Sequence, residues 1–176
     1  MSLFSDPTLE LYLVDASAWF DVDKRNDAED VWRLIERLIR DGRLFAPSQV
    51  IEEIFRDGGL KQRLGPYEGK LTENDRDDIE YFRKLGEITR QFPAMCHATG
   101  TRERADGYVV ALAELDGYTV VADETANKRP NRKIPGVCKQ LQIRCLTLEE
   151  FVQIERARQA KKEDESEPDA TQPAPV

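Results

Sequence analysis

The sequence is poor in cysteine and histidine, two residue types that often build metal centres and nucleophilic sites. Its 176 residues include three cysteines, Cys96, Cys138 and Cys145, without a Cys-x-x-Cys pair. An odd number without that spacing argues against a disulfide framework and a zinc knuckle, and it favours a reducing cytoplasm. His97 is the only histidine, so a Ser-His-Asp triad would have to use it. We therefore expect catalytic chemistry to depend on carboxylates, hydroxyls or lysine.

Long apolar runs are also missing. No stretch approaches the roughly 20 apolar residues that a membrane span needs, so no membrane partner is expected. Residues Met1 to Glu10 contain neither a basic region nor a long apolar stretch, so no signal peptide is expected. These observations together predict a cytoplasmic protein.

The chain lacks an excess of positive charge. Its net charge of −8 argues against a general nucleic-acid scaffold, which would be basic. A hydrophobic share of 40% is enough for one core, and the length suits one domain. We expect that domain at residues 10–156, after a leader at 1–9. Residues 157–176 are predicted to form a disordered acidic tail, because no large apolar residue follows about Lys161.

Short apolar runs alternate with helical patterns along the chain. Four runs are typical of buried strands: Leu11–Val14, Leu44–Pro47, Tyr118–Ala122 and Ile143–Leu146. Helices are expected from a cap at Asn26 or Asp27 to Arg40, from a cap at Ser48 to Gly58-Gly59, from a cap at Thr72 to Gln91, from Thr101 to Leu115, around Pro135 within Lys133 to Leu141, and after a cap at Thr147. The stretch Leu60–Tyr67 is rich in turn-forming residues. This alternation predicts an α/β fold, a three-layer α/β/α sandwich with a central, mostly parallel sheet, and a helical insertion at residues 58–100.

Acidic residues follow three of these runs. Asp15 comes where the first strand ends, and Asp123 and Glu124 come where the third ends. Glu52 and Glu53 lie in the first helical turns after the second strand, and helical spacing does not distinguish between them. Because the carboxyl ends of parallel strands share one edge of a sheet, we expect these carboxylates to converge there.

Asp106 supplies a further acid. Val109, Val110 and Ala113 follow it at helical spacing, so it is expected on their core-facing side. A carboxylate there is costly unless it is paired or bound to a metal ion. A salt bridge to Arg102, one turn earlier, is the alternative.

A cluster of carboxylates needs a cation, since like charges raise one another's pKa. Mg²⁺ suits such a cluster because it prefers oxygen ligands and keeps several water molecules. It can activate one of these and stabilise the charge that grows on a phosphate. The pattern therefore indicates phosphodiester hydrolysis.

Four segments, in this order, resemble the successive motifs of PIN domains, a family that includes the VapC-type toxins of toxin–antitoxin pairs. They are Asp15-Ala16-Ser17, Pro47-Ser48-x-Val50-x-x-Glu53-Ile54, Ala105-Asp106-x-x-Val109-x-Ala111-x-Ala113 and Val120-Val121-Ala122-Asp123-Glu124. In addition, the segment Lys133-Ile134-Pro135-x-Val137-Cys138 resembles a PIN-like group of unassigned function. The resemblance covers about Leu11 to Phe151.

The resemblance implies a hydrolase, namely a Mg²⁺- or Mn²⁺-dependent endoribonuclease that cuts single-stranded RNA. It identifies Asp15, Glu53 and Asp106 as catalytic, metal-binding acids and Ser17 as a supporting hydroxyl. The last acid is Asp123 or Glu124, and Ala122 stands where the family usually has Thr. An antitoxin protein and a second copy of the chain, in a homodimer, are the partners that the family suggests.

Basic residues near the expected acidic edge are candidates for RNA binding. They are Lys128, Arg129, Arg132 and Lys133, with Arg102 and Arg104 close to Asp106. Contacts of such cations with phosphates position RNA without reading its sequence. The alternative is a solvated loop.

Other functions remain in competition with this reading. A non-catalytic PIN-like module that binds RNA or protein would also fit, with its site altered around Ala122. A haloacid-dehalogenase-like phosphatase would need an aspartate two residues after Asp15, where Ser17 stands. A metal-dependent cleavage assay distinguishes the endoribonuclease from the non-catalytic module.

Overall fold

The computed structural model describes residues 9–96, 105–124 and 131–166. The predictions made for residues 1–8, His97, Arg102, Arg104, Lys128, Arg129 and residues 167–176 lie outside these ranges. Among the residues described, no helix is both long and apolar enough to cross a membrane.

The centre of the fold is a sheet of four parallel strands in the order β2-β1-β3-β4. The strands are β1 (Tyr12–Val14), β2 (Leu44–Phe45), β3 (Thr119–Val121) and β4 (Cys145–Leu146). Nearly all of their side chains are buried, which explains why the sequence shows continuous apolar runs there. The chain moves from β1 to β2 on one side and then to β3 on the other. The strand order therefore reverses between β1 and β3, and in open α/β sheets this crevice is where sites form.

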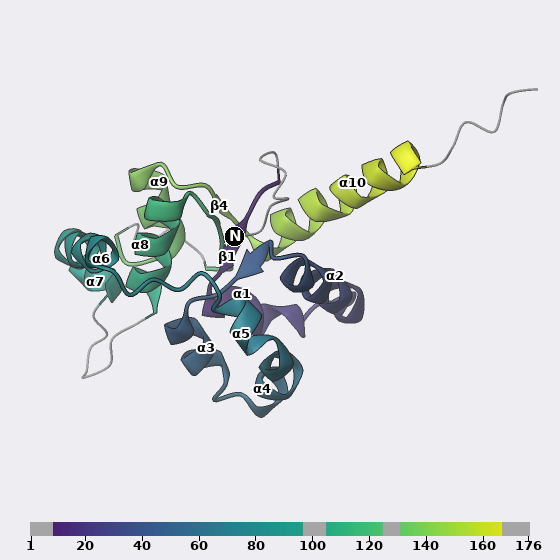
Figure 1. Cartoon of the computed structure of the whole chain (residues 1–176), viewed down its shortest axis with the longest axis horizontal. Coiled ribbons are helices and arrows are strands. Elements are labelled where there is room, and N and C mark those ends of the chain that lie inside the picture. The colour runs from purple at the N-terminus through teal and green to yellow at the C-terminus, as the bar shows by residue number, and fades with distance from the viewer. Residues whose placement is uncertain (1–8, 97–104, 125–130, 167–176) are drawn as a thin grey trace, which may run out of the picture.

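Helices cover both faces of the sheet, so the predicted three-layer α/β/α sandwich is confirmed. Figure 1 shows α2 (Ala28–Arg40) and α10 (Leu148–Ser166) on one side of the sheet. On the other side lie α6 (Ile79–Gln91), α7 (Pro93–Cys96), α8 (Asp106–Asp116) and α9 (Ile134–Leu141). Helix α8 contacts β1 and β3 and carries α6 on its outer side.

The helix directly after β1, α1 (Ala16–Val22), was not predicted. Its N-cap is Asp15, whose side chain accepts a hydrogen bond from the Ser17 backbone N–H. Trp19 of this helix is buried and stacks on Trp32 of α2, with 6.1 Å between ring centroids. The segment is too short to show a helical period, so only packing identifies it.

Between β2 and α6 the chain forms short helices whose starts and ends were predicted wrongly. They are α3 (Ser48–Ile54), α4 (Gly58–Leu64), a 3-10 turn at Gly65–Tyr67 and α5 (Glu68–Leu71). Gly58-Gly59 begins α4 instead of ending a helix, because the Asp57 side chain accepts from the backbone N–H groups of Gly59 and Leu60. The segment predicted as turns is therefore largely helical.

Two further caps come from aspartates that the sequence pattern did not single out. Helix α6 begins at Ile79 and not near Thr72, because the Asp78 side chain accepts from the Tyr81 N–H. Two large apolar side chains of α6, Ile79 and Phe82, are exposed, whereas Ile88 is buried. Ser48 is the first residue of α3 and not its cap; its backbone N–H and hydroxyl both donate to Asp75.

The last helix is longer than expected. Thr147 and Glu150 form a reciprocal capping box at its start, as the predicted cap at Thr147 suggested. Helix α10 then continues to Ser166, so the boundary predicted at residue 157 falls inside a helix. Figure 1 shows its last turns extending away from the other elements.

Candidate active site

A cavity of about 280 Å³ opens at the carboxyl edge of the sheet, at the crevice between β1 and β3. The residues that line it are Asp15, Ala16, Ser17, Phe20, Glu53, Asp106 and Glu124. Four carboxylates from four separate segments thus face one space. We call it the carboxylate pocket.

Asp15 lies deepest, directly after β1, and is 4% exposed. Its Oδ2 accepts from the Ser17 backbone N–H at 3.0 Å and from the Ser17 hydroxyl at 2.7 Å. Burial raises the pKa of Asp15, the two bonds from Ser17 oppose that rise, and the charge of Glu124 adds to it. No arginine or lysine of the described residues pairs with Asp15, so its charge is poorly compensated.

Ser17 also connects two loops. Its hydroxyl donates to Asp15 and accepts from the Asp123 backbone N–H at 3.0 Å. The loop after β3 is thereby held against the start of α1. The hydroxyl predicted as a supporting group therefore sets the position of the segment that carries Glu124.

Glu124, and not Asp123, faces the pocket. One Glu124 oxygen, Oε1, accepts from the Lys133 ammonium at 2.6 Å. The other, Oε2, is buried and has no hydrogen-bond partner among the described residues. Asp123 is exposed and absent from the lining; burial and then the neighbouring Asp21 carboxylate raise its pKa. Of the two acids that the sequence left open, only Glu124 lines the carboxylate pocket.

The structure also separates Glu53 from Glu52. Both are in α3, which packs against α1. Glu53 is half-buried and lines the pocket, whereas Glu52 is exposed. The Glu53 side chain makes no hydrogen bond or ion pair within the described ranges. Its carboxylate is therefore available to a ligand.

Asp106 reaches the pocket from the start of α8. It is the first residue of this helix and half-buried, one turn before the buried Val109 and Val110, as its helical spacing predicted. The helix N-terminus carries partial positive charge that favours a carboxylate. A Cβ on the next residue, Gly107, would come within 2.9 Å of the Cys96 sulfur, so this glycine lets α7 pack closely beside Asp106. Arg102, its suggested partner, lies outside the described residues.

The donor set suits a hard divalent cation, although the side chains are not yet gathered as ligands. Carboxylates are the oxygen donors that Mg²⁺ and Mn²⁺ prefer, and of the four here Glu124 has a buried oxygen without a partner in the described chain. In the ranges described, no three His, Cys, Asp or Glu side chains are grouped closely enough to hold a metal ion. Binding would therefore require rotation of side chains such as Glu53.

Of the cations predicted to bind RNA, two are described. Lys133 lies beside the pocket, bound to Glu124, and Arg132 is exposed. The other four lie outside the described ranges. Lys133 was predicted to contact phosphate, and in the structure its first partner is a carboxylate.

Phe20 is the lining residue that sequence reasoning missed. It is 38% exposed, which is unusual for a large aromatic side chain next to the fully buried Trp19. The signal was present as an aromatic pair in the segment Ala18-Trp19-Phe20, but it needed α1 to be recognised. An exposed ring at the rim of a pocket is suited to stacking on a planar ligand.

The three cysteines are free thiols; Cys96 and Cys138 are buried.

No curated protein matches this chain. The family model described as "Domain of unknown function (DUF4411)" matches residues 12–159, which include every strand and the whole carboxylate pocket. The chain therefore belongs to the DUF4411 family.

Proposed function

We propose that this protein is a metal-dependent endoribonuclease that hydrolyses phosphodiester bonds of single-stranded RNA. The observation that carries the proposal is the carboxylate pocket, where Asp15, Glu53, Asp106 and Glu124 line one cavity. A structural role would pair these acids with arginines or lysines. Asp15 and Glu53 have no such partner in the described part of the chain, which favours a role toward a ligand.

When bound, Mg²⁺ or Mn²⁺ would supply a polarised water nucleophile and positive charge for the phosphate oxygens. Asp15 and Glu124 would hold the cation, because Asp15 is rigid and Glu124 has a buried oxygen in need of a partner. Glu53 and Asp106 would complete the set after rotation of their side chains. Ser17 orients Asp15 and holds the loop of Glu124.

The chain's own groups also suggest how the substrate lies. Lys133 would exchange Glu124 for a phosphate of the substrate once a cation occupies the pocket. Phe20 would stack on an unpaired base next to the cleaved bond, since such stacking contributes about 1–3 kcal/mol per base. A duplex cannot present a base in this way, which supports a single-stranded substrate.

The test uses two neighbouring glutamates of α3. Purified protein should cleave single-stranded RNA with Mg²⁺ or Mn²⁺, and a chelator should stop the reaction. Glu53→Gln should reduce the rate by about 100-fold, the scale of losing one charged group from an active site. Glu52→Gln is the matched control, because Glu52 is exposed one residue away and should retain the parent rate.

Two results would reject the proposal. Cleavage that survives chelation, or that is equal in both variants, would point to a contaminating nuclease. RNA binding without cleavage under any metal would instead favour the non-catalytic module. An antitoxin partner and a homodimer stay predictions, to be checked by copurification and by mass measurement in solution.

A further inference from the structure

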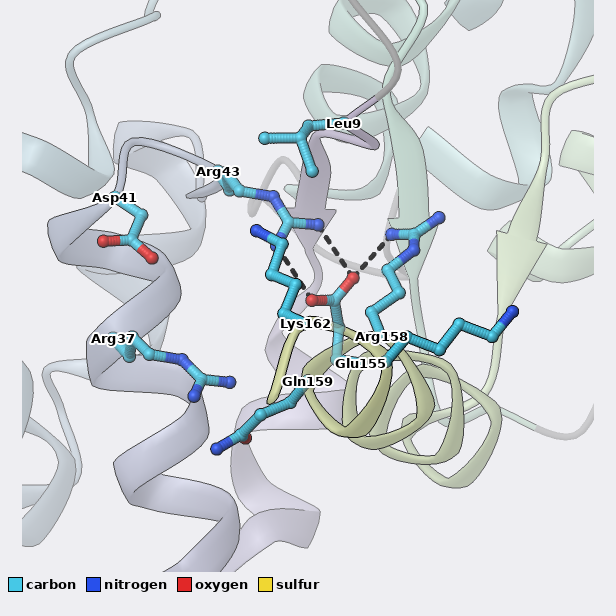
Figure 2. Close-up of a pocket in the computed structure, with 9 residues that line it drawn as sticks. Leu9, Arg37, Asp41, Arg43, Glu155, Arg158, Gln159 and Lys162 are labelled. Atoms are coloured by element: carbon cyan, nitrogen blue, oxygen red, sulfur yellow. Dashed lines mark hydrogen bonds and ion pairs between the residues drawn. The ribbon is translucent and has the colours of Figure 1, made fainter. Parts of the chain in front are cut away.

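A second cavity lies at the opposite, amino edge of the sheet. It measures about 350 Å³, and its lining residues are Leu9, Arg37, Asp41, Arg43, Glu155, Arg158, Gln159, Lys161 and Lys162. We call it the basic pocket. Figure 2 shows Arg37 extending from α2 and Lys162 from α10 toward the space between the two helices, with Arg43 next to Lys162.

The charge of this pocket is opposite to that of the whole protein. Five of its lining residues are cationic and two are acidic, in a chain of net charge −8. Concentrated positive charge in an acidic protein is costly unless an anion compensates it. The pocket therefore needs an explanation beyond ordinary surface solvation.

Only part of this charge is used to hold the fold together. Glu155 accepts two hydrogen bonds from Arg43, at 2.8 and 2.9 Å, and one from Arg158 at 2.6 Å. These bonds fasten α10 to the sheet. Arg43 keeps a buried Nε–H with no partner in the described chain.

The remaining cations have no such role. Arg37, Lys161 and Lys162 form no ion pair within the described residues. Arg37 is in the last turn of α2, where a cation is favoured by the helix dipole. That preference does not account for the two lysines, which come to the same cavity from a different helix.

We propose that the basic pocket binds a small anion that carries adjacent phosphates, such as pyrophosphate or a nucleoside diphosphate. Guanidinium groups bind phosphate oxygens in pairs, and lysines add point charges around them. The volume falls in the range of small-molecule sites, roughly 300–1,000 Å³. A polymer would instead need a groove that follows its backbone. The proposal does not depend on the carboxylate pocket, which lies at the other edge of the sheet.

Calorimetric titration of the full chain tests this inference. Pyrophosphate and adenosine diphosphate are titrated separately, with a chelator present and at constant ionic strength. We expect one site per chain. Arg37→Gln combined with Lys162→Gln should weaken binding by about tenfold or more, because two charge-assisted contacts are lost.

The control is a second double variant with the same change in charge, Lys61→Gln with Lys139→Gln. Both lysines are exposed and lie outside the basic pocket, so this variant should bind like the parent. If the first variant unfolds, Lys161→Gln with Lys162→Gln replaces it, since both side chains are exposed on α10 and should be removable without loss of folding.

The two ligands distinguish the source of the phosphates. Tighter binding of adenosine diphosphate indicates a nucleotide, and equal binding indicates recognition of the diphosphate alone; both support the proposal. Absence of binding at about 1 mM ligand, the upper limit of useful affinity, overturns it. Equal weakening in the control variant also overturns it, by showing general charge attraction. Binding of a single-stranded RNA alone, lost in the pocket variant, would assign the pocket to a polymer and reject the small ligand.

Discussion

The two edges of the sheet differ in how far the charge of a buried acid is compensated. At the amino edge, Glu155 is 2% exposed and is surrounded by Arg43, Arg158 and the Tyr12 hydroxyl. At the carboxyl edge, Asp15 is 4% exposed, accepts two hydrogen bonds from Ser17, and forms no ion pair with an arginine or lysine of the described chain. Burial alone would raise the pKa of both carboxyls. At Glu155 the arginine and tyrosine bonds outweigh that effect and lower the pKa, whereas at Asp15 the pKa stays raised.

The difference shows at which edge a buried charge stabilises the fold and at which edge it stays uncompensated. A buried acid with two arginines joins α10 to the sheet, and its charge is cancelled inside the protein. A buried acid beside other acids lowers the stability of the fold, and folding does not require it. Such a cost is typical of sites that bind a charged ligand. Changing one acid at a time tests this difference between the two edges of the sheet.

The largest effect on RNA cleavage is expected from a change of Glu124 in the carboxylate pocket. Glu124→Gln should lower RNA cleavage by about 100- to 1,000-fold, because it removes the unpartnered oxygen proposed to hold the cation. Asp123→Asn should lower cleavage by less than about tenfold, since Asp123 does not line the pocket and would act only through the loop. Cleavage rates with saturating Mg²⁺ check both. The reverse order of the two variants would return the ligand role to Asp123.

At the amino edge the expected loss is one of stability. Glu155→Gln leaves Arg43 without its counter-charge and Arg158 with Glu10 alone, and it should lower the free energy of unfolding by about 3 kcal/mol. Glu149→Gln is the control on the same helix, because its exposed pair with Arg25 contributes at most about 1 kcal/mol. Urea denaturation measures both. Equal losses would mean that burial of the Glu155 network does not matter.

The same network predicts sensitivity to acid. Because the folded pKa of Glu155 lies below its ordinary value of 4.5, its stabilisation is fully present above that pH and is lost as the pH falls through the folded pKa. Unfolding measured between neutral pH and strong acid should therefore show a loss below about pH 4.5 that is smaller in Glu155→Gln. Identical acid profiles would remove Glu155 as the cause.

The smallest expected effect is that of Asp15→Asn, which should increase stability instead of lowering it. Asp15→Asn removes an uncompensated buried charge and should raise the stability of the metal-free protein by about 1 kcal/mol, as at other sites where function opposes stability. Asparagine retains an oxygen that can accept from Ser17. Mg²⁺ should raise the melting temperature of the parent but not of this variant. A destabilised variant that still responds to Mg²⁺ would contradict the proposed role of Asp15.

Much of the carboxylate pocket could be predicted because parallel strands end at one edge. Asp15 and Glu124 follow strands whose apolar runs are visible in the sequence, and topology alone then brings them together. The resemblance chose Glu53 over Glu52, and the structure agrees in placing only Glu53 in the cavity. Asp106 lines the pocket as well, although its helix begins at Asp106 itself and not near Thr101 as predicted.

Other features could not be predicted, because their partners are distant in the sequence. The Asp75 side chain binds Ser48 across 27 residues, and Glu155 binds Arg43 across 112. Helical periodicity and capping rules read only neighbours within a few residues. The short α1, with Phe20 at the pocket rim, left no periodic signal for the same reason.

Amino-acid order alone therefore determined the strands, their parallel arrangement and the set of acids at their ends, since these follow from local hydrophobic patterns and the handedness of crossovers. The fold decided which acids are compensated. Whether a buried carboxylate is neutralised depends on which cation reaches it through space, and that is known only when α10 and the loops are in place. The basic pocket between α2 and α10 exists for the same reason, because its cations come from two helices that meet only in the folded chain.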